Sequence, residues 1–326
     1  MVRTPALLLN QDLSLCLGER DIPVPQLGEV LLRVEWAGVC DSDVHVIATG
    51  AGVWSWPATL GREVVGMVES CPGNELVVGT RVVIDSRASC GACVDCAEGT
   101  QRCENLSWVG EAYPGGFQGH LLIPVDRVVA CPSELEAPIA VLAEPLAVAM
   151  HALNAVTVEP RQVRILGYGA IGALVHLEIG RCWPHALVSV VEPLPQRRQI
   201  ARAFGAAIEG DEHYLVEPAQ LVVDAAGYST SFLDAIRNCE NGGTVLVVAF
   251  GHEPVSLVSA AIAVREITVL GVNAFKNELP EAVAALTANP DRYRPVVTEV
   301  VLLEEAAERI CALASSPSAG KLLVRP

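Results

Sequence analysis

The stretch VRILGYGAIG, residues 163–172, joins an apolar run to a turn with glycines at 167, 169 and 172. The spacing is G-x-G-x-x-G, and the flanking patterns predict a strand before it and a helix after it. Gly167 permits a tight turn, Gly169 lets a pyrophosphate approach the backbone, and Gly172 lets helix and sheet pack closely. The stretch therefore predicts a dinucleotide-binding turn.

The residues after the turn favour NAD over NADP. Ala170 and Ile171 open the expected helix, whose free N–H groups face bound phosphates. The next apolar run ends in Glu192, 20 residues after the last glycine, where a carboxylate accepts hydrogen bonds from ribose hydroxyls and repels a 2′-phosphate. Arg197 and Arg198 follow, and their charge leaves NADP open as an alternative. A structural glycine turn with a surface glutamate is the remaining interpretation.

Strand and helix patterns alternate around this turn, which predicts a parallel sheet with helices on both faces. The expected strands are 163–166, 187–191, 221–224, 244–249 and 267–270, and the expected helices are 139–155, 170–181, 195–204 and 230–238. The preceding part reads as a mostly β domain with strands at its beginning and at 28–36, 64–68, 80–85 and 120–124. The tail, with helices at 280–286 and 304–314 and strands at 296–301 and 321–324, resembles that first domain. We therefore divide the chain into residues 1–140, 141–276 and 277–326.

Composition excludes several classes of partner. The 326 residues carry a net charge of −16 with a pI of about 4.8, which argues against nucleic acid. The sequence contains no basic run suited to an anionic membrane and no uninterrupted apolar run of about 18 residues, so we expect a cytoplasmic protein without a membrane partner. Eleven cysteines, an odd number, argue against a disulfide framework.

Four of these cysteines predict a structural zinc site. Cys90, Cys93, Cys96 and Cys103 have the spacing C-x2-C-x2-C-x6-C. Four thiolates so close in sequence close a tetrahedral site that has no open position for a substrate. An iron–sulfur cluster is the alternative that the thiolates alone leave open.

Together these features resemble the medium-chain dehydrogenase/reductase superfamily, and within it the zinc-type alcohol, sorbitol and threonine dehydrogenase branch. The resemblance spans essentially the whole chain, through GVCDSDVH at 38–45, LGREVVG at 60–66, the cysteine loop, GGFQGH at 115–120 and EPLAVA at 144–149. It implies an α/β protein with a GroES-like catalytic domain, which the tail re-enters, and an inserted Rossmann domain with a doubly wound parallel sheet. It also implies a homo-oligomer, either a dimer or a tetramer.

By this resemblance, Cys40 is the first ligand of a catalytic zinc, and Glu144 is a further ligand. Ser42 is a proton-relay hydroxyl, and His45 is the relay histidine. These four residues match the family's pattern for the active site, and Cys40, Glu63 and Glu144 remain as possible metal ligands.

One position departs from the family pattern: Arg62 stands where the family has its zinc-binding histidine, and Glu63 follows it. A guanidinium has no lone pair to donate and stays charged, so it would repel a divalent ion. We therefore expect no catalytic zinc. Arg62 either stabilises a developing alkoxide or only closes the empty site by pairing with Glu144 or Glu63.

The leading hypothesis is hydride transfer between NAD(H) and an alcohol or ketone carbon of a polyol, sugar or aminocyclitol, with one structural zinc per chain. Trp54, Trp56, Trp108 and Tyr113 either offer faces for sugar rings or anchor loops. A zinc-independent enone reductase is the alternative enzyme. A non-catalytic nucleotide-binding protein is the alternative from another class.

Overall fold

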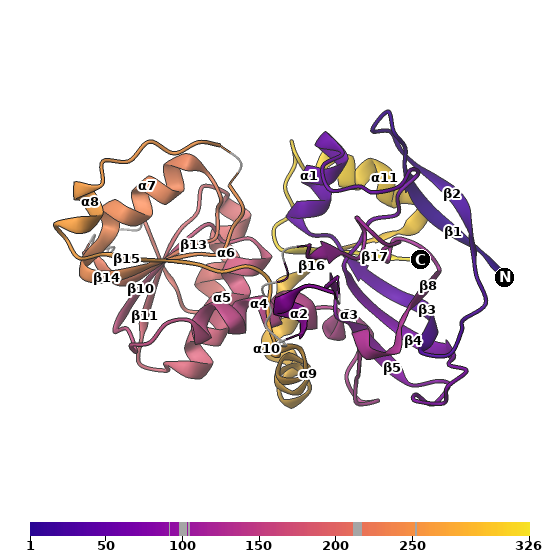
Figure 1. Ribbon diagram of the computed structural model, residues 1–326. Helices are drawn as coiled ribbons and strands as arrows, with labels where there is room; N and C mark the ends of the chain where they lie inside the picture. The colour runs from indigo at the N-terminus through magenta and orange to yellow at the C-terminus, as the bar shows by residue number, and fades with distance from the viewer. Residues whose placement is uncertain (91, 98–102, 104, 211–216, 252) are drawn as a thin grey trace. The chain divides into compact units, whose positions relative to one another are not determined.

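The computed structural model describes residues 1–90, 92–97, 103, 105–210, 217–251 and 253–326. It divides the chain into two compact units. The first contains Met1–Glu144, Leu279–Pro290 and Val297–Pro326, and the second contains Pro145–Glu278 and Asp291–Val296. Both termini lie in the first unit (Figure 1).

A mixed sheet with the strand order β16-β17-β3-β4-β5-β9 forms the body of the first unit, and β8 pairs with β3. β3 is central because its apolar residues are buried and both of its edges are paired. Leu32, Val64, Val82 and Phe117 lie in the core of this unit. The elements before the second unit are β1 (Val2–Leu9), β2 (Leu15–Ile22), β3 (Glu29–Gly38), α1 (Asp41–Thr49), β4 (Glu63–Ser70), β5 (Arg81–Ile84), β6 (Arg87–Ala88), α2 (Val94–Ala97), β7 (Ser107–Trp108), β8 (His120–Pro124), β9 (Val128–Ala130) and α3 (Ala137–Ala140).

The tail completes this sheet. β16 runs parallel to β17, and β17 runs antiparallel to β3, with Leu323 opposite Gly38. The backbone N–H of Val39 donates to the carbonyl of Leu322 at 2.9 Å, so the start of β17 lies beside the end of β3. The elements of the tail are α9 (Leu279–Ala288), α10 (Pro290–Tyr293), β16 (Val297–Leu302), α11 (Leu303–Ala312) and β17 (Lys321–Arg325).

The second unit is a doubly wound parallel sheet with the order β12-β11-β10-β13-β14-β15. α5 and α6 connect strands in one direction from β10, whereas α7 connects β13 to β14 in the other direction. Because such crossovers are right-handed, α5 and α7 cover opposite faces of the sheet (Figure 1). The elements are α4 (Ala143–Asn154), β10 (Gln162–Leu166), α5 (Ala170–Cys182), β11 (Leu187–Val191), α6 (Pro195–Ala203), β12 (Ala207–Ile208), β13 (Ala219–Asp224), α7 (Ser229–Asn238), β14 (Cys239–Val247), α8 (Ala260–Ala263) and β15 (Thr268–Gly271).

The structure confirms the predicted fold class and differs from the sequence-based elements mainly at their ends. The single helix expected over 139–155 is divided into α3 and α4, because the backbone turns at residues 141–142. β14 begins at Cys239, five residues earlier than expected. The region Ala137–Asn154 is long and apolar enough to cross a membrane by length and composition alone, but 78% of it is buried inside the protein, as in a core helix.

Candidate active site

The N-terminus of α1 positions Cys40, which is the residue immediately before the helix. The carboxylate of Asp43 accepts hydrogen bonds from the backbone N–H of Cys40 at 2.9 Å and from that of Gly61 at 3.3 Å. Asp43 therefore joins the segment that carries Cys40 to the segment that carries Arg62. Burial of this carboxyl raises its pKa to about 6, although Arg62 acts in the opposite direction.

Arg62 forms an ion pair with Glu111, and its guanidinium lies over the ring of Trp108, 5.3 Å from the centroid. The expected pairing with Glu144 or Glu63 is therefore replaced by one with Glu111. Burial opposes the charge on Arg62, but the acidic groups around it raise its pKa further above the ordinary value. The guanidinium thus remains a cation in a position that is mostly shielded from water.

Glu63 is paired with a residue from the tail. The ammonium of Lys321 donates to Oε1 of Glu63 at 2.5 Å and to the carbonyl of Val39 at 3.1 Å. The side chain of Glu63 is 1% exposed and that of Lys321 is 4% exposed, so the ion pair is buried. Although burial opposes the charged form of Lys321, the neighbouring carboxylate raises its pKa. Glu63 therefore forms its ion pair with Lys321 through Oε1, whereas among the described residues Oε2 is buried without a hydrogen-bond partner.

Glu144, at the start of α4, accepts a hydrogen bond from the hydroxyl of Ser86 at 2.9 Å. Both side chains are buried. Burial, reinforced by the charge of Glu63, raises the pKa of Glu144 to about 7. Its partner is thus a neutral hydroxyl, and Arg62 acts on it only through its electric field.

The residues near Cys40 fit a divalent metal ion poorly. Burial, and then the charge of Glu63, raise the pKa of the Cys40 thiol to about 12. Arg62 brings a positive charge in place of a lone pair. In the part of the chain that the structure describes, the only cluster of three or more histidine, cysteine or acidic residues with metal-binding geometry is the four-cysteine loop.

Ser42 and His45 both lie on α1, three residues apart and therefore on the same side of the helix. Among the described residues, the hydroxyl of Ser42 is buried without a hydrogen-bond partner. Leaving such a group unpaired costs about 1–3 kcal/mol, which a bound hydroxyl or carbonyl oxygen would recover. This is the arrangement expected of a hydroxyl that completes its hydrogen bonds with a substrate.

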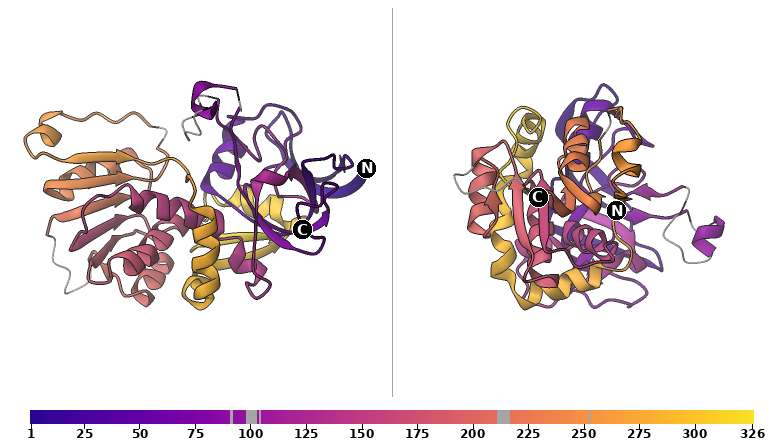
Figure 2. Two further views of the ribbon diagram at one scale, coloured as in Figure 1. Left: turned by 60° about the horizontal axis from the view of Figure 1, so that its bottom comes forward. Right: turned by 90° about the vertical axis from the view of Figure 1, so that its left-hand side faces the viewer.

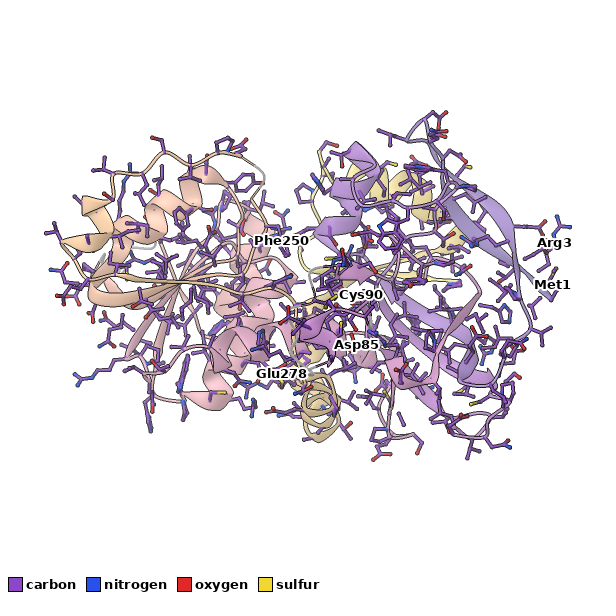
Figure 3. The ribbon with its side chains drawn as sticks, in the orientation of Figure 1. Met1, Arg3, Asp85, Cys90, Phe250 and Glu278 are labelled. Carbon is purple, nitrogen blue, oxygen red and sulfur yellow. The ribbon has the colours of Figure 1, made fainter. Side chains whose placement is uncertain are left out.

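α2, which carries Cys96 of the four-cysteine loop, projects from the body of the first unit (Figure 2), and Cys90 is labelled in Figure 3. All four sulfur atoms lie within 4.8 Å of one another. Sγ of Cys96 lies 3.9 Å from Sγ of Cys90 and 3.5 Å from Sγ of Cys93. These distances are close to the roughly 3.8 Å between sulfur atoms of a tetrahedral zinc site. Hydrogen bonds, chiefly from the backbone N–H of Ala92, lower the pKa of Cys90 to about 6. The loop fits a zinc ion.

The glycine turn of the second unit has the geometry that its motif requires. Gly167 has a φ of 86°, and a Cβ at this position would lie 2.9 Å from Ala226, two residues after the neighbouring strand β13. A Cβ on Gly172 would lie 2.3 Å from the carbonyl oxygen of Gly167. Around Gly169, by contrast, a Cβ would meet only the guanidinium of Arg197, at 3.6 Å or more. The space above Gly169 suits a diphosphate.

Glu192, just after β11, holds this turn. Its carboxylate accepts the backbone N–H groups of Tyr168 at 2.7 Å and of Leu194 at 2.8 Å. Arg197 lies 3.9 Å from the same carboxylate. Glu192 is thus fixed in orientation at the carboxyl end of β11, where a dinucleotide's ribose is bound in folds of this kind.

Some residues that shape the turn were not identified from the sequence. The hydroxyl of Tyr168 is 2.7 Å from Nδ1 of His176, and both residues are buried. Burial lowers the pKa of His176 to about 4, so this histidine is neutral. Asp224, at the end of β13, accepts hydrogen bonds from the backbone of Ala226 and the hydroxyl of Ser231. A polar residue at the end of an apolar strand was the available signal for Asp224.

Comparison with known families agrees with this architecture. Residues 26–133 match the model of the alcohol dehydrogenase GroES-like domain, and residues 183–288 match the model of the zinc-binding dehydrogenase family. The chain belongs to the medium-chain dehydrogenase/reductase superfamily, in its zinc-type alcohol and polyol dehydrogenase branch. This dehydrogenase is therefore an enzyme of the alcohol dehydrogenase class.

Relatives of this dehydrogenase match it over most of their length. A zinc-type alcohol dehydrogenase-like protein of Haemophilus influenzae is 28% identical over 91% of this chain and 92% of its own. A sorbitol dehydrogenase of Arabidopsis thaliana is 27% identical over 84% of this chain and 82% of its own. A zinc-binding dehydrogenase of Sinorhizobium meliloti, crystallised with NADP, is 27% identical with a TM-score of 0.90 and full coverage of both chains.

The structure brings most of the predicted catalytic residues of this dehydrogenase into one neighbourhood. The charges of Arg62, Glu63 and Asp43 act on Cys40, and those of Arg62 and Glu63 act on Glu144. Sequence reasoning missed four residues that fix this neighbourhood, namely Asp43, Ser86, Glu111 and Lys321. Trp108 had been singled out as an aromatic for sugar rings or loop packing, and the structure places its ring against Arg62. Only Asp43 had a usable signal, since an acid three residues after a helix cap is a capping pattern.

Proposed function

We propose that this dehydrogenase transfers a hydride between NAD(H) and an alcohol or ketone carbon of a polyol, sugar or aminocyclitol without a catalytic zinc ion. The observation that carries the proposal is the ion pair of Arg62 with Glu111, which keeps a buried cation beside Cys40. The polyol class is supported by the resemblance to sorbitol dehydrogenase. One structural zinc per chain, held by the four cysteines, belongs to the same proposal.

The turn over residues 167–172 would hold the nicotinamide dinucleotide, which would supply the hydride for the carbonyl carbon in the reducing direction. The electrons of the C=O double bond then move to oxygen, which takes a proton, and the reverse sequence oxidises an alcohol. We assign stabilisation of the negative charge on that oxygen to the guanidinium of Arg62. The hydroxyl of Ser42 passes the proton, and His45 exchanges it with solvent.

We assign the dinucleotide to the turn formed by Gly167, Gly169 and Gly172, with the N–H groups of Ala170 and Ile171 facing the diphosphate. Glu192 favours NAD(H), because its buried carboxylate repels a 2′-phosphate. The charge of Arg197 is partly balanced by Glu192 and does not reverse this preference. Titration with NADH and NADPH tests the assignment: NADH should bind more tightly, and the Glu192→Ala variant should narrow the difference.

A homo-oligomer, either a dimer or a tetramer, completes the proposal. β15 ends the strand order of the parallel sheet and exposes Val269 by 39%, so one edge is available for pairing with another copy. Light scattering of the purified protein measures the number of chains in the assembly directly.

The decisive experiment is a zinc count on the purified enzyme combined with an assay of nicotinamide oxidation. We expect one zinc per chain, and oxidation of NADH with a keto sugar such as D-fructose but not with the enone 2-cyclohexen-1-one. A count of two zinc ions would overturn the metal-free mechanism. Turnover of the enone alone would favour the reductase alternative, and binding of NADH without any turnover would favour a non-catalytic protein.

Two matched cysteine variants locate the metal. Cys93→Ser should lose the zinc and lower the stability of the first unit by several kcal/mol, because structural zinc contributes directly to folding. Cys40→Ser should retain one zinc. If Cys40→Ser lost zinc while Cys93→Ser kept it, the assignment of the two sites would be reversed.

A further inference from the structure

The turn over residues 108–113 carries two side chains to the same guanidinium. The carbonyl of Trp108 accepts the backbone N–H groups of Glu111 at 3.1 Å and of Ala112 at 3.0 Å. The N–H of Gly110 donates to the carbonyl of Tyr113 at 2.7 Å. The backbone therefore fixes Trp108 and Glu111 relative to each other, and both contact Arg62.

This turn is packed directly on the segment before Arg62. A Cβ on Gly110, whose φ is 95°, would lie 3.3 Å from the backbone nitrogen of Gly61. A Cβ on Gly115 would lie 2.4 Å from the carbonyl oxygen of Leu60. Backbone hydrogen bonds from Gly115 to Thr59 and from Gly116 to Gly61 complete the contact. The frame that holds Glu111 is therefore built from backbone that approaches Arg62 closely.

Glu111 is held on its other side by the loop after α1. A Cβ on Gly52 would lie 2.6 Å from Oε2 of Glu111, and the N–H of Trp54 donates to the carbonyl of Glu111 at 3.2 Å. Oε1 receives the guanidinium of Arg62. With the Glu111 side chain 16% exposed and that of Arg62 11% exposed, neither has much freedom to move.

We propose that Glu111, together with the ring of Trp108, is a positioning residue that fixes the guanidinium of Arg62 in the orientation required to stabilise the substrate oxygen. The inference rests on the proposed function, since it gives Arg62 that task. Glu111 itself contacts neither substrate nor cofactor in this mechanism. It takes the place of the metal geometry that holds the activating cation in zinc-dependent relatives.

Two observations and one general principle support this role. Glu63 and Glu144 are bonded to Lys321 and Ser86, and among the carboxylates described Glu111 is the one that forms an ion pair with Arg62. The face of the guanidinium is covered by Trp108, which restricts its rotation. A group that stabilises a developing charge must be oriented before the reaction, because misplacement by about 1 Å lowers a rate by about 100-fold.

The test compares Glu111→Ala with a matched control in the same unit. Glu35 pairs with Arg81 at 2.7 Å, and its side chain is also 16% exposed, so Glu35→Ala removes an equivalent ion pair away from the site. We expect Glu111→Ala to lower kcat for NADH-dependent reduction of D-fructose, or of the most active keto sugar of a panel, by about 10- to 100-fold. KM, NADH affinity and melting temperature should change no more than in Glu35→Ala.

A double-mutant cycle separates this inference from the proposed function. Arg62→Ala should lower kcat strongly, and Glu111→Ala should cause no further loss in that background, because Glu111 acts through Arg62. An equal loss in both backgrounds, or an unchanged kcat in Glu111→Ala alone, would overturn the positioning role and leave the proposed function intact. An unchanged kcat in Arg62→Ala would overturn the proposed function itself.

A crystal structure of Glu111→Ala supplies a readout that needs no substrate. The guanidinium of Arg62 should leave the face of Trp108, with the rest of the first unit unchanged. A guanidinium that keeps its position would show that Glu111 is not what holds it and would overturn the inference.

Discussion

The glycine turn at 167–172 and the neighbourhood of Cys40 are built in different ways. The turn presents backbone N–H groups, and its shape depends on the absence of side chains at Gly167 and Gly172. The Cys40 neighbourhood depends on side chains from distant parts of the chain, Arg62 with Glu111 and Glu63 with Lys321. A site formed by backbone groups tolerates no substitution at the glycines that give it its shape. A site formed by side chains can accept a different residue, provided that new ion-pair partners stabilise it.

The largest expected effect tests the backbone site. Gly169→Val should abolish detectable NADH binding by calorimetry, because the new side chain occupies the space assigned to the diphosphate. The fold should persist, since a Cβ at this position meets only Arg197, at ordinary contact distance. Gly271→Val is the control, as no atom lies within 4 Å of a Cβ there. Unchanged NADH affinity in Gly169→Val would refute the assignment of the turn.

The next effect concerns the buried pair of the side-chain site. Lys321→Met leaves the carboxylate of Glu63 buried without its partner, which should lower the free energy of unfolding by about 3–5 kcal/mol. Urea titration measures this value. The double variant Lys321→Met with Glu63→Gln should recover much of the loss, because no unpaired charge remains. If Lys321→Met were as stable as the original enzyme, the ion pair between Lys321 and Glu63 would not contribute to the stability of the first unit.

A third test replaces Arg62 by histidine, the residue that binds zinc at this position in the family pattern. Arg62→His removes the cation and supplies a lone pair beside Cys40 and Glu144, so we expect the zinc content to rise from one to two per chain. Arg62→Gln, which removes the charge without supplying a good ligand, should stay at one. Equal zinc content in both variants would mean that Arg62 is not what excludes the metal.

The smallest expected effect is a dependence of folding stability on pH, which arises from the buried His176 next to the glycine turn. His176 has a pKa of about 4 in the folded protein against 6.5 as its ordinary value, because it is buried. Between these values the unfolded chain binds a proton that the folded chain does not, so stability is complete above pH 6.5 and falls as the pH is lowered toward 4. The loss should approach about 3 kcal/mol. His176→Gln should flatten this part of the stability–pH curve. An unchanged slope would show that His176 does not cause the loss of stability.

The sequence predicted the fold class because its signals are local. The glycine spacing at 167–172 and the alternation of strands and helices depend on residues close together in the chain, and the structure confirms the parallel sheet they predict. The cysteine spacing likewise placed four sulfur atoms together. The substitution at Arg62 was also visible, because the pattern around it is contiguous.

Only the tertiary structure decided how the altered site is stabilised. Arg62 and Glu111 lie 49 residues apart, and Glu63 and Lys321 lie 258 residues apart. Nothing in the local pattern distinguishes Glu111 from Glu63 or Glu144 as the partner of Arg62. Pairing of buried charges follows distance and desolvation after the chain has folded, so the sequence determined that an arginine stands at position 62 and the fold determined which carboxylate it pairs with.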